Sequence, residues 1–424
     1  MQPPELVVGL TRVLEDAGYE AWCVGGGVRD ALLGIPNLDW DLTTSAKPQE
    51  VRRMFRRTIP VGIEFGTVGV LDDAGVMHEV TTFRADVETD GRHAVVRFGK
   101  SLDEDLARRD FTINAMAYSP SRDELRDPFG GQSDIASRTL RAVGIAKERM
   151  REDRLRALRA MRFAARFGFT IEPATWQAIV SSAPHLGRLS PERVQQEIVK
   201  TMRQVARPGT AFRLWRDSGA LAELIPSLAG ITDTELLALD HLRRPLLARR
   251  PQRLQGRLTG LFSAARPGTV LATLKTLRFS NADATWISGV VDLWHDMGHE
   301  MKQALMGAEA PPDGLLRAWA GRAGRTRIAS LLRLADAHWW AERESGARAP
   351  SRVRVESVYR RAVRIAYRDP VSISDLAVNG EDLQKTGIAG KRLGDALRSL
   401  LQYVLENPSR NTRDELLRRA GELT

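Results

Sequence analysis

The pattern of hydrophobic and polar positions changes once along the chain. Up to about residue 135, short β-branched and apolar runs predict strands at 20–24, 39–43, 66–71 and 76–83. Helical patterns between them predict helices at 28–33, 48–55 and 110–118. Asp72–Gly75 parts the last two strands and is typical of a hairpin turn. We therefore expect a small domain with a mixed sheet at the start of the chain.

After about Ser137 the strand patterns stop, and apolar residues recur at helical spacing, for example over 148–167, 191–205 and 233–247. Breaks that contain Pro and Gly lie near 206–209, 265–269, 310–314 and 346–351. The predicted fold class is thus α+β. We divide it into a head (residues 1–136), followed by a helical neck (137–206), body (207–350) and tail (351–424).

Composition is that of a soluble globular protein, with 424 residues of which 43% are hydrophobic and 27% charged. Apolar runs stay well short of the roughly 18–20 residues that span a bilayer, so we expect no membrane association. The chain starts without the basic and apolar segments of a secretory signal. Its single cysteine, Cys23, excludes a disulfide framework and a Cys-rich zinc site. These features favour the cytoplasm.

The charge balance adds an expectation about partners. Lys and Arg number 63 against 53 Asp and Glu, which gives a net charge of +10. Such a balance favours a polyanionic partner, with nucleic acid first and an anionic membrane surface a distant second. Arginine, with its planar fork, supplies much of the excess and suits phosphate. Solubility alone is the alternative explanation.

Two short patterns near the start point to phosphate chemistry. Asp39 and Asp41 are two apart in a predicted strand, so their carboxylates share a face. Adjacent anions repel unless a cation neutralises them, and Mg²⁺ takes such oxygen ligands. Before them, the glycines at 25–27 join a strand to a helix, where backbone N–H groups attract phosphate, and Arg29 adds a cation. A solvated acidic pair and a tight turn are the alternatives.

Together these residues form part of a longer resemblance. Gly25–Asp30, Leu33–Gly34 and Asp39–Thr44 resemble the first motif of the bacterial class II tRNA CCA-adding nucleotidyltransferases, which poly(A) polymerases of the polymerase-β-like superfamily share. Similar motifs continue at His78–Arg84, Ala107–Ala115, Asp127–Gly131, Arg151–Phe163, Ser190–Arg193 and Ile373–Leu383. Motif order and spacing match over about residues 20–205, whereas 206–360 match loosely.

The resemblance implies roles for residues of the head. Asp39 and Asp41 would hold Mg²⁺ against the triphosphate, with Gly26 and Arg29 cradling it. Glu79 would be a third catalytic carboxylate, although an ordinary half-exposed strand residue is the alternative.

The motif around Arg109 and Asp110 resembles the family's contact with the nucleotide sugar. Asp110 can accept a hydrogen bond from a 2′-hydroxyl, and Asn114, one helical turn on, would support it. Asp110 could also cap a helix, and the two roles can coexist.

Base choice is expected from Asp153 and Arg156. Cytosine and adenine each present an amino donor beside a ring acceptor, which an aspartate and an arginine satisfy together. Guanine and uracil mismatch both contacts, at about 1–3 kcal/mol for each buried unpaired group. Arg159 and Arg162 continue at spacing three, a stripe that drifts by roughly 60° per step, and the resemblance assigns them to the phosphates. An arginine-rich amphipathic helix is the alternative.

Some positions depart from the family or imitate another one. Phe65 stands where the family usually has a histidine. His295-Asp296 and His299 resemble a metal-dependent phosphohydrolase core, but His241 is the only nearby upstream histidine, so we interpret them as polar helix-end residues. The segment 84–99 has the length of the family's flexible loop, which disfavours an enzyme that adds only C residues.

The sequence thus predicts a template-independent enzyme that adds CCA to the 3′ end of tRNA from CTP and ATP with Mg²⁺, releasing pyrophosphate. Its partners would be the acceptor end of tRNA, clasped by body and tail, together with ATP and CTP, and no stable protein partner is expected. Addition of A alone, poly(A) synthesis, and a non-catalytic RNA-binding role are the alternatives.

Overall fold

The computed structural model describes residues 1–36, 40–63, 66–71, 75–85, 97–98, 101–242 and 254–422. The chain divides into two compact units, one of residues 1–197 and 214–224, the other of residues 198–213 and 225–424. The boundaries of head, neck, body and tail stay predictions. Asp39, Phe65, the turn residues 72–74 and most of the segment 84–99 lie outside the described ranges.

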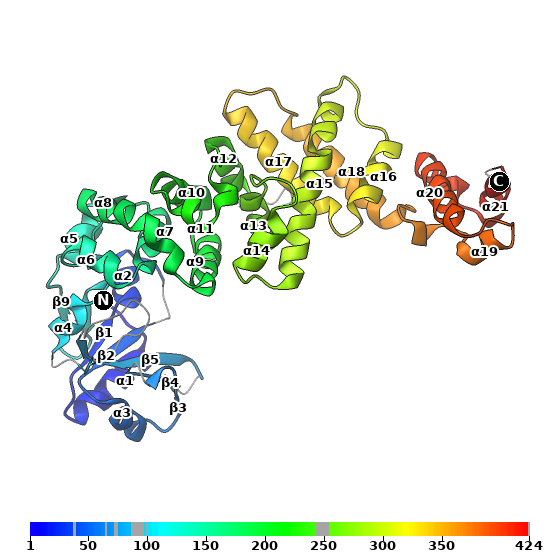
Figure 1. Ribbon diagram of the computed structural model, residues 1–424. Coiled ribbons are helices and arrows are strands. Elements are labelled where there is room, and N and C mark those ends of the chain that lie inside the picture. The colour runs from blue at the N-terminus through cyan, green and yellow to red at the C-terminus, as the bar shows by residue number, and fades with distance from the viewer. Residues whose placement is uncertain are drawn as a thin grey trace. The chain divides into compact units, whose positions relative to one another are not determined.

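A seven-stranded mixed sheet forms the centre of the first unit, with the order β3-β4-β5-β2-β1-β8-β9 (Figure 1). Its strands are β1 (Ala21–Val24), β2 (Asp41–Thr44), β3 (Thr58–Ile59), β4 (Thr67–Leu71), β5 (Met77–Thr82), β8 (Ala117–Ser119) and β9 (Glu124–Arg126). The pair β2–β5 is parallel, and the other neighbours are antiparallel. The predicted α+β class and the predicted β4–β5 pairing are confirmed.

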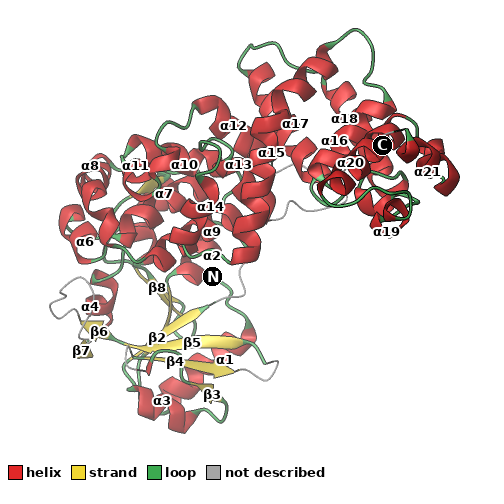
Figure 2. Cartoon of the chain, turned by 45° about the vertical axis from the view of Figure 1, so that its right-hand side comes forward, coloured by secondary structure: helices red, strands yellow, loops and turns green. Residues whose placement is uncertain are grey.

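The two faces of this sheet differ. Leu42 and Val80 are paired across β2 and β5 and are fully buried in a core with side chains of α1 (Glu5–Asp16) and α3 (Pro48–Met54). On the opposite face, Trp22 and Val24 of β1 pack with the short helix α4 (Leu102–Ala107). Because successive strand residues point to opposite faces, Asp41 and Glu79 lie on this second face. Figure 2 shows the strands with α1 and α3 beside them.

Helices complete the first unit. They are α2 (Gly26–Leu32), α5 (Gly131–Ala136), α6 (Ala146–Glu152), α7 (Leu155–Phe167), α8 (Pro173–Ser182) and α11 (Ala220–Leu224), with part of α9 (Pro191–Gln204) and of α10 (Pro208–Asp217). The expectation that strands stop after Ser137 is wrong, because β10 (Thr139–Leu140) pairs with β11 (Thr170–Ile171) in parallel. Two-residue strands are too short for a periodic pattern.

Two predicted helices also need correction. Residues 110–118 form a 3₁₀ turn, η2 (Thr112–Asn114), followed by β8, rather than one helix. Every residue from 111 to 119 is buried, so the segment has no polar face, and Ala117 pairs with Val24 in the sheet centre. The predicted helix 148–167 is divided at Asp153, which is extended at φ −140°. The Asp153 carboxylate accepts a hydrogen bond from the backbone of Leu155, where α7 begins.

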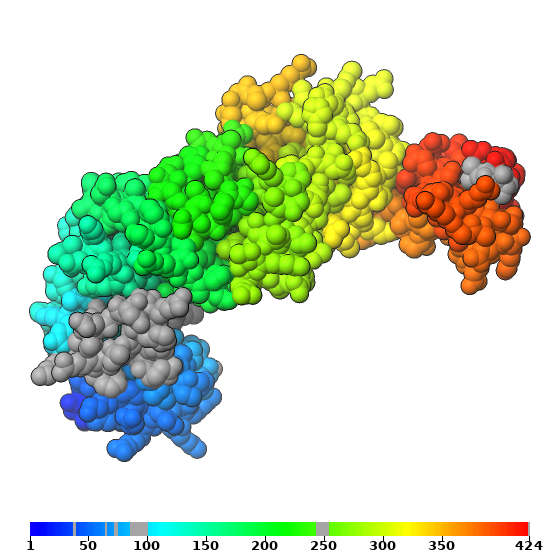
Figure 3. Space-filling view, in the orientation of Figure 1, coloured from blue at the N-terminus to red at the C-terminus, as the bar shows by residue number. Residues whose placement is uncertain are grey.

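The described part of the second unit is helical, as predicted. Its helices are α12 (Asp233–His241), α13 (Leu254–Phe262), α14 (Val270–Thr276), α15 (Asn281–Met306), α16 (Asp313–Ala323), α17 (Ile328–Glu344), α18 (Arg352–Arg368), α19 (Gly380–Gln384), α20 (Lys391–Glu406) and α21 (Arg413–Gly421). Trp319 and Trp339 are buried in a core that α15–α18 share. Leu383, Leu400 and Leu416 form a second core among α19–α21, which Figure 3 draws in orange and red.

None of the helices in the described ranges combines the length and the apolar character that crossing a bilayer requires.

Candidate active site

The carboxylates expected to bind metal lie at neighbouring strands. Asp41 is the first residue of β2 and is half-buried, while Glu79 on β5 is exposed. Leu42 pairs with Val80 in the parallel ladder, so Asp41 and Glu79 stand at the same level on the same face. The position of Asp39 lies outside the described ranges. The strand register therefore brings two of the three predicted catalytic residues to adjacent strands.

The glycine turn between β1 and α2 brings a cation to the same place. Gly25 has φ +69°, a backbone conformation that residues with a side chain rarely adopt. A Cβ added at Gly25 would lie 2.9 Å from Nη1 of Arg109 and 4.0 Å from Oδ2 of Asp41. The backbone of the turn thus passes close to both charged groups. One of the predicted sugar residues and one of the predicted metal ligands meet here.

The other two glycines have different surroundings. Gly26 begins α2, and a Cβ there would make only an ordinary contact of 3.5 Å with Arg29. A Cβ at Gly27 would lie 2.8 Å from the ring of Trp40, which is buried in the sheet core. Gly27 is therefore required for packing, whereas Gly25 is required for the shape of the turn.

Arg29 is an interior side chain, only 4% exposed. It donates to Asn114 Oδ1 at 2.6 Å and pairs with Asp30 at 2.6 Å. Its guanidinium also lies over the rings of Phe163 and Phe167 on α7. Burial lowers the pKa of Arg29, and the adjacent Asp30 carboxylate opposes that effect. Arg29 thus connects α2 to η2 and α7.

The carboxylate of Asp110 is buried and surrounded by donors. Oδ1 accepts hydrogen bonds from the backbone of Phe111 and from Asn114 Nδ2, both at 2.9 Å. Oδ2 accepts a hydrogen bond from Nε of Arg159 at 2.8 Å, and Nη2 of the same guanidinium lies 2.7 Å from Oδ2. Burial raises the pKa of Asp110, but the Arg159 charge and the Asn114 hydrogen bond outweigh it, so the pKa lies below its usual range. These four contacts fill the acceptor capacity of an ionised carboxylate.

The predicted base-reading residues stand at the division between α6 and α7. Asp153 Oδ2 accepts from Arg193 Nη2 at 2.8 Å. Arg156 donates to Glu152 Oε2 at 2.6 Å and, with Nη2, to the backbone oxygen of Arg108 at 3.0 Å. Because Asp153 lies before the start of α7, the angular drift expected for a spacing of three applies only from Arg156 onward.

The arginines along α7 point to different partners. Arg159 pairs with Asp110, as described above, whereas Nε of Arg162 donates to Glu197 Oε2 on α9 at 2.8 Å. Arg162 is 3% exposed and Glu197 is 1% exposed. Burial lowers the pKa of Arg162, and the Glu197 charge opposes it. The structure therefore separates Arg162 from the half-exposed end of the helix.

Several side chains that contact the predicted residues were given no role from sequence. Asp30 pairs with Arg29 and in turn with Arg166. Asp105 accepts from Arg109, Glu152 pairs with Arg156, and Arg193 and Glu197 on α9 pair with Asp153 and Arg162. The motif Ser190–Arg193 did mark the start of α9, but no sequence spacing connects it to Asp153, 40 residues earlier.

The phosphohydrolase-like residues His295 and Asp296 have other partners in the structure. His295 and Asp296 are inside α15, so their interpretation as helix-end residues is wrong. His295 Nε2 lies 3.0 Å from the backbone oxygen of Ala265, and Asp296 pairs with Arg322. Among the residues described, no three His, Cys, Asp or Glu side chains are grouped so that they could hold a metal ion.

Comparison with known proteins yields two family matches. Residues 21–141 match a family model described as the poly A polymerase head domain. Residues 168–231 match one described as a probable RNA- and SrmB-binding site of polymerase A. The first segment contains the sheet and the glycine turn, and the second contains α8 to α11.

Curated relatives carry the name CCA-adding enzyme. The one from Geobacillus kaustophilus is 45% identical over 258 residues, which are 60% of this chain and 62% of the relative. The one from Limosilactobacillus fermentum is 35% identical over 420 residues, 97% of this chain and 94% of the relative. The alignments to the first relatives span only 54–62% of those proteins' length.

Solved structures are similar over almost the full chain. The CCA-adding enzyme of Bacillus stearothermophilus in complex with CTP aligns with a TM-score of 0.76 and 32% identity, covering 100% of this chain and 98% of that one. The Thermotoga maritima CCA-adding enzyme complexed with tRNA aligns with a TM-score of 0.68 at 21% identity over 99% and 95% of the two chains. The latter similarity concerns the fold.

Proposed function

Because the chain belongs to the family of the CCA-adding enzymes, we propose that it adds C, C and A to the 3′ end of tRNA. CTP and ATP are the nucleotide substrates, the acceptor end of tRNA is the primer, and pyrophosphate is released. A relative matched over 97% of the chain and a CTP complex aligned over all of it support this proposal. Action in the cytoplasm is the expected setting.

One observation carries the catalytic part of the proposal: the backbone of the turn at Gly25 lies close to both the carboxylate of Asp41 and the guanidinium of Arg109. Binding of a nucleoside triphosphate requires positive charge and a close approach of backbone N–H groups to the phosphates. The Gly25 turn and the adjacent Arg109 offer both. Asp41 and Glu79 present hard oxygen donors on one sheet face, which is the chemistry that Mg²⁺ prefers.

Nucleotidyltransferases related to the matched head domain generally use divalent metal ions, and we infer that Asp39 and Asp41, with Glu79 beside them, hold Mg²⁺. The ion would lower the pKa of the primer 3′-hydroxyl and stabilise the leaving pyrophosphate. Asp41 is the first residue of a central strand, so its position is fixed by the ladders to β1 and β5.

The sugar is read by Asp110 in this proposal. Because Asn114, Phe111 and Arg159 already fill its acceptor positions, a 2′-hydroxyl must replace one of these donors. Arg159 is the donor that a nucleotide can replace, since it comes from a long side chain on another element. Once released, its guanidinium is free to contact the phosphates. The same arginine thereby serves both sugar and phosphate recognition.

The base is read by Asp153 and Arg156 at the start of α7. Aspartate accepts from the amino group of cytosine or adenine, and arginine donates to the neighbouring ring nitrogen. Both side chains now hold other partners, Arg193 and Glu152, so nucleotide binding exchanges contacts that the protein already makes. Each mismatch with guanine or uracil leaves a polar group unpaired, at about 1–3 kcal/mol.

The proposal is tested by extension of three tRNA substrates, ending before CCA, after the first C and after CC. With CTP and ATP together, all three should end in CCA; with ATP alone, only the last should be extended. If only the substrate ending in CC is extended, and only when ATP is present, the enzyme adds A alone. Long adenylate tails would identify a poly(A) polymerase, and no incorporation in Mg²⁺ would favour an RNA-binding protein.

A further inference from the structure

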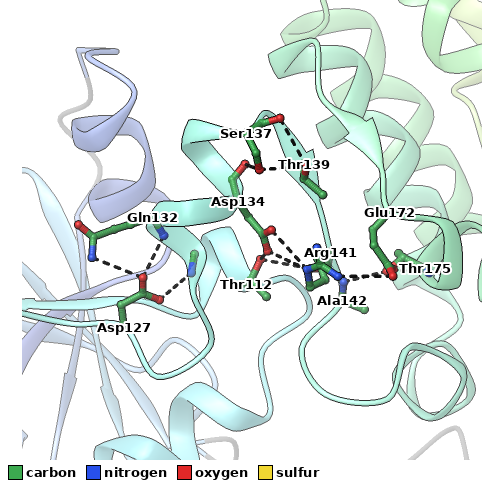
Figure 4. Close-up of polar contacts among 11 residues, drawn as sticks. Thr112, Asp127, Gln132, Asp134, Ser137, Thr139, Arg141, Ala142, Glu172 and Thr175 are labelled. Atoms are coloured by element: carbon green, nitrogen blue, oxygen red, sulfur yellow. Dashed lines mark hydrogen bonds and ion pairs between the residues drawn. The ribbon is translucent and has the colours of Figure 1, made fainter.

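The motif Asp127–Gly131 has no role in the site described so far. Asp127 caps the following helix: its carboxylate accepts the backbone N–H groups of Gly131 at 2.7 Å and Gln132 at 3.0 Å (Figure 4). Gly130 has φ +72°, so the chain turns sharply before α5 begins. The motif therefore sets the start and direction of α5.

Helix α5 rests directly on the backbone of the turn η2. A Cβ added at Gly131 would lie 2.4 Å from the carbonyl oxygen of Thr112 and 2.8 Å from Sδ of Met116. A glycine at this position lets the helix approach that closely. The short distance means that a displacement of α5 moves η2 as well.

A buried carboxylate on α5 holds the same turn. Asp134 is 6% exposed, and its Oδ2 accepts the hydroxyl of Thr112 at 2.7 Å. Arg141 Nε lies 3.2 Å from the same oxygen, and the backbone N–H of Thr112 donates to the Arg141 carbonyl at 3.0 Å. Figure 4 shows Thr112 beside Asp134 and Arg141. Thr112 is thus held through both its side chain and its backbone.

These contacts continue to the start of α8. Arg141 pairs with Glu172 at 3.4 Å, and Glu172 accepts from the backbone and hydroxyl of Thr175, both at 2.7 Å. The Thr175 hydroxyl accepts in turn from the backbone of Ala142 at 3.1 Å. Asp134 is therefore part of a support anchored on two helices.

The turn so held carries the proposed sugar contacts. Asn114 is the last residue of η2, two after Thr112. Its side chain donates to Asp110 and accepts from Arg29. A shift of η2 would thus change the orientation of the Asp110 carboxylate, through Asn114, without touching the nucleotide.

We propose that Asp134 is a positioning residue for sugar selection: its hydrogen bond to Thr112 holds the turn that aligns Asn114 and Asp110 for the 2′-hydroxyl. This inference rests on the proposed function, because it takes Asp110 as the sugar contact. It assigns a purpose to the Asp127–Gly131 motif, which orients α5 so that Asp134 reaches Thr112.

A positioning role and a merely structural one differ in what they change. Loss of fold stability lowers activity with CTP and with dCTP alike. Misalignment of Asp110 weakens only the contact with the 2′-hydroxyl, which dCTP lacks. The informative quantity is therefore the ratio of kcat/KM for CTP to that for dCTP, measured with tRNA that ends before CCA.

The experiment compares Thr112→Val, which removes the hydroxyl at nearly constant shape, with Thr112→Ser, which keeps it. Thr112→Val should lower the ratio about threefold to tenfold, a partial loss of one hydrogen bond to a charged group. Thr112→Ser keeps the hydrogen bond, so its ratio of kcat/KM values should stay within about twofold of the wild type. Asp134→Asn is the second variant if Thr112→Val is insoluble, and it should lower the ratio similarly.

Two further variants separate the outcomes. Asp110→Asn should lower the ratio more than any other change, and Ser137→Ala, on the same segment, should leave it unchanged. If Asp110→Asn lowers the ratio while Thr112→Val and Asp134→Asn keep the wild-type value, the positioning role is wrong and the proposed function stands. If the wild type adds no nucleotide, or Asp110→Asn keeps the ratio, the proposed sugar site fails and the inference with it.

Discussion

Burial determines what each charged side chain around the site can contribute. The pair Arg162–Glu197 is almost fully buried, so removal of one partner would leave an uncompensated charge, at about 3–5 kcal/mol. The pair Arg126–Asp103 is largely solvated and therefore contributes little. Asp41 and Asp153 lie between these extremes, half-buried, as expected of groups that must meet a ligand.

The clearest prediction for a single residue concerns Asp41. Asp41→Asn keeps the shape of the side chain and removes the charge that would hold Mg²⁺. Nucleotide addition should fall by at least about a hundredfold, because metal stabilisation of the transition state is worth several kcal/mol. tRNA binding, measured by filter retention, should survive.

Asp103→Asn is the matched control. It is the same substitution in the same unit, at a half-exposed carboxylate on α4, and addition should stay within about twofold of the wild type because surface pairs contribute little. Substantial addition by Asp41→Asn would overturn the metal assignment.

A second prediction concerns base choice. Arg156→Ala removes the donor expected to face the ring nitrogen of cytosine or adenine. Incorporation of UTP relative to CTP should rise by roughly one decade, the worth of one mismatched polar contact. Competition between the two nucleotides on tRNA ending before CCA measures it, and unchanged selectivity would rule out base reading by Arg156.

Candidate residues for the site could be chosen from the sequence, but most of their contacts could not be predicted. Motif spacing pointed to Asp41, Arg109 and Asp110, and the structure places Asp41 and Arg109 close to Gly25. The sequence offered no indication that Arg193 pairs with Asp153 or that Glu197 pairs with Arg162. Such pairs join helices far apart in sequence, and their geometry depends on how α9 packs against α7.

At the scale of single elements, the hydrophobic pattern succeeded where an apolar or β-branched run is bounded by turn residues and where apolar residues recur at helical spacing. It located β1, α2, α3 and the β4–β5 pair to within a few residues. It failed at 110–118, where all residues are buried and periodicity carries no information, and at Asp153, where a local hydrogen bond divides the helix. It also missed α5 and β10, which are too short for a pattern.

The close approach of α5 to η2 leads to a prediction about stability. Gly131→Ala should destabilise the first unit by about 1–3 kcal/mol, because the added methyl group meets a backbone oxygen that cannot move aside. Thermal unfolding of the full chain should show a lower midpoint for that unit.

Gly9→Ala is the control for this change. Gly9 lies inside α1, where an added Cβ meets nothing within 4 Å. The same substitution should therefore stabilise the helix by about 0.5–1 kcal/mol. Equal midpoints for the two variants would contradict the close-packing argument.

At the scale of the whole molecule, the sequence predicted an all-α second part but not which helices share a core. Helical periodicity identifies an apolar stripe on α15 or α20, yet any apolar stripe can face any other. The structure resolves this into a core of α15–α18 and another of α19–α21. The boundary between body and tail was placed from breaks in the pattern and stays a prediction.

The net charge of +10 predicts how tRNA binding responds to salt. If about five phosphates are neutralised, affinity should fall by roughly two to three decades between 50 mM and 200 mM salt. Titration of fluorescent tRNA at several salt concentrations measures the slope. CTP binding, with few charges, should change much less, and a tRNA slope near zero would contradict a phosphate-dominated interface.

The filled acceptor positions of Asp110 have a consequence for turnover. Arg159 already contacts the Asp110 oxygen that the proposed function assigns to the nucleotide sugar, so under that proposal Arg159 and the sugar compete for this carboxylate. Binding then exchanges one set of hydrogen bonds for another, and the net gain is small even though the contacts are many. Under the proposed function, we therefore expect a modest affinity for each nucleotide. In the proposed reaction one site would empty and refill three times on every primer, and loose binding would favour fast turnover.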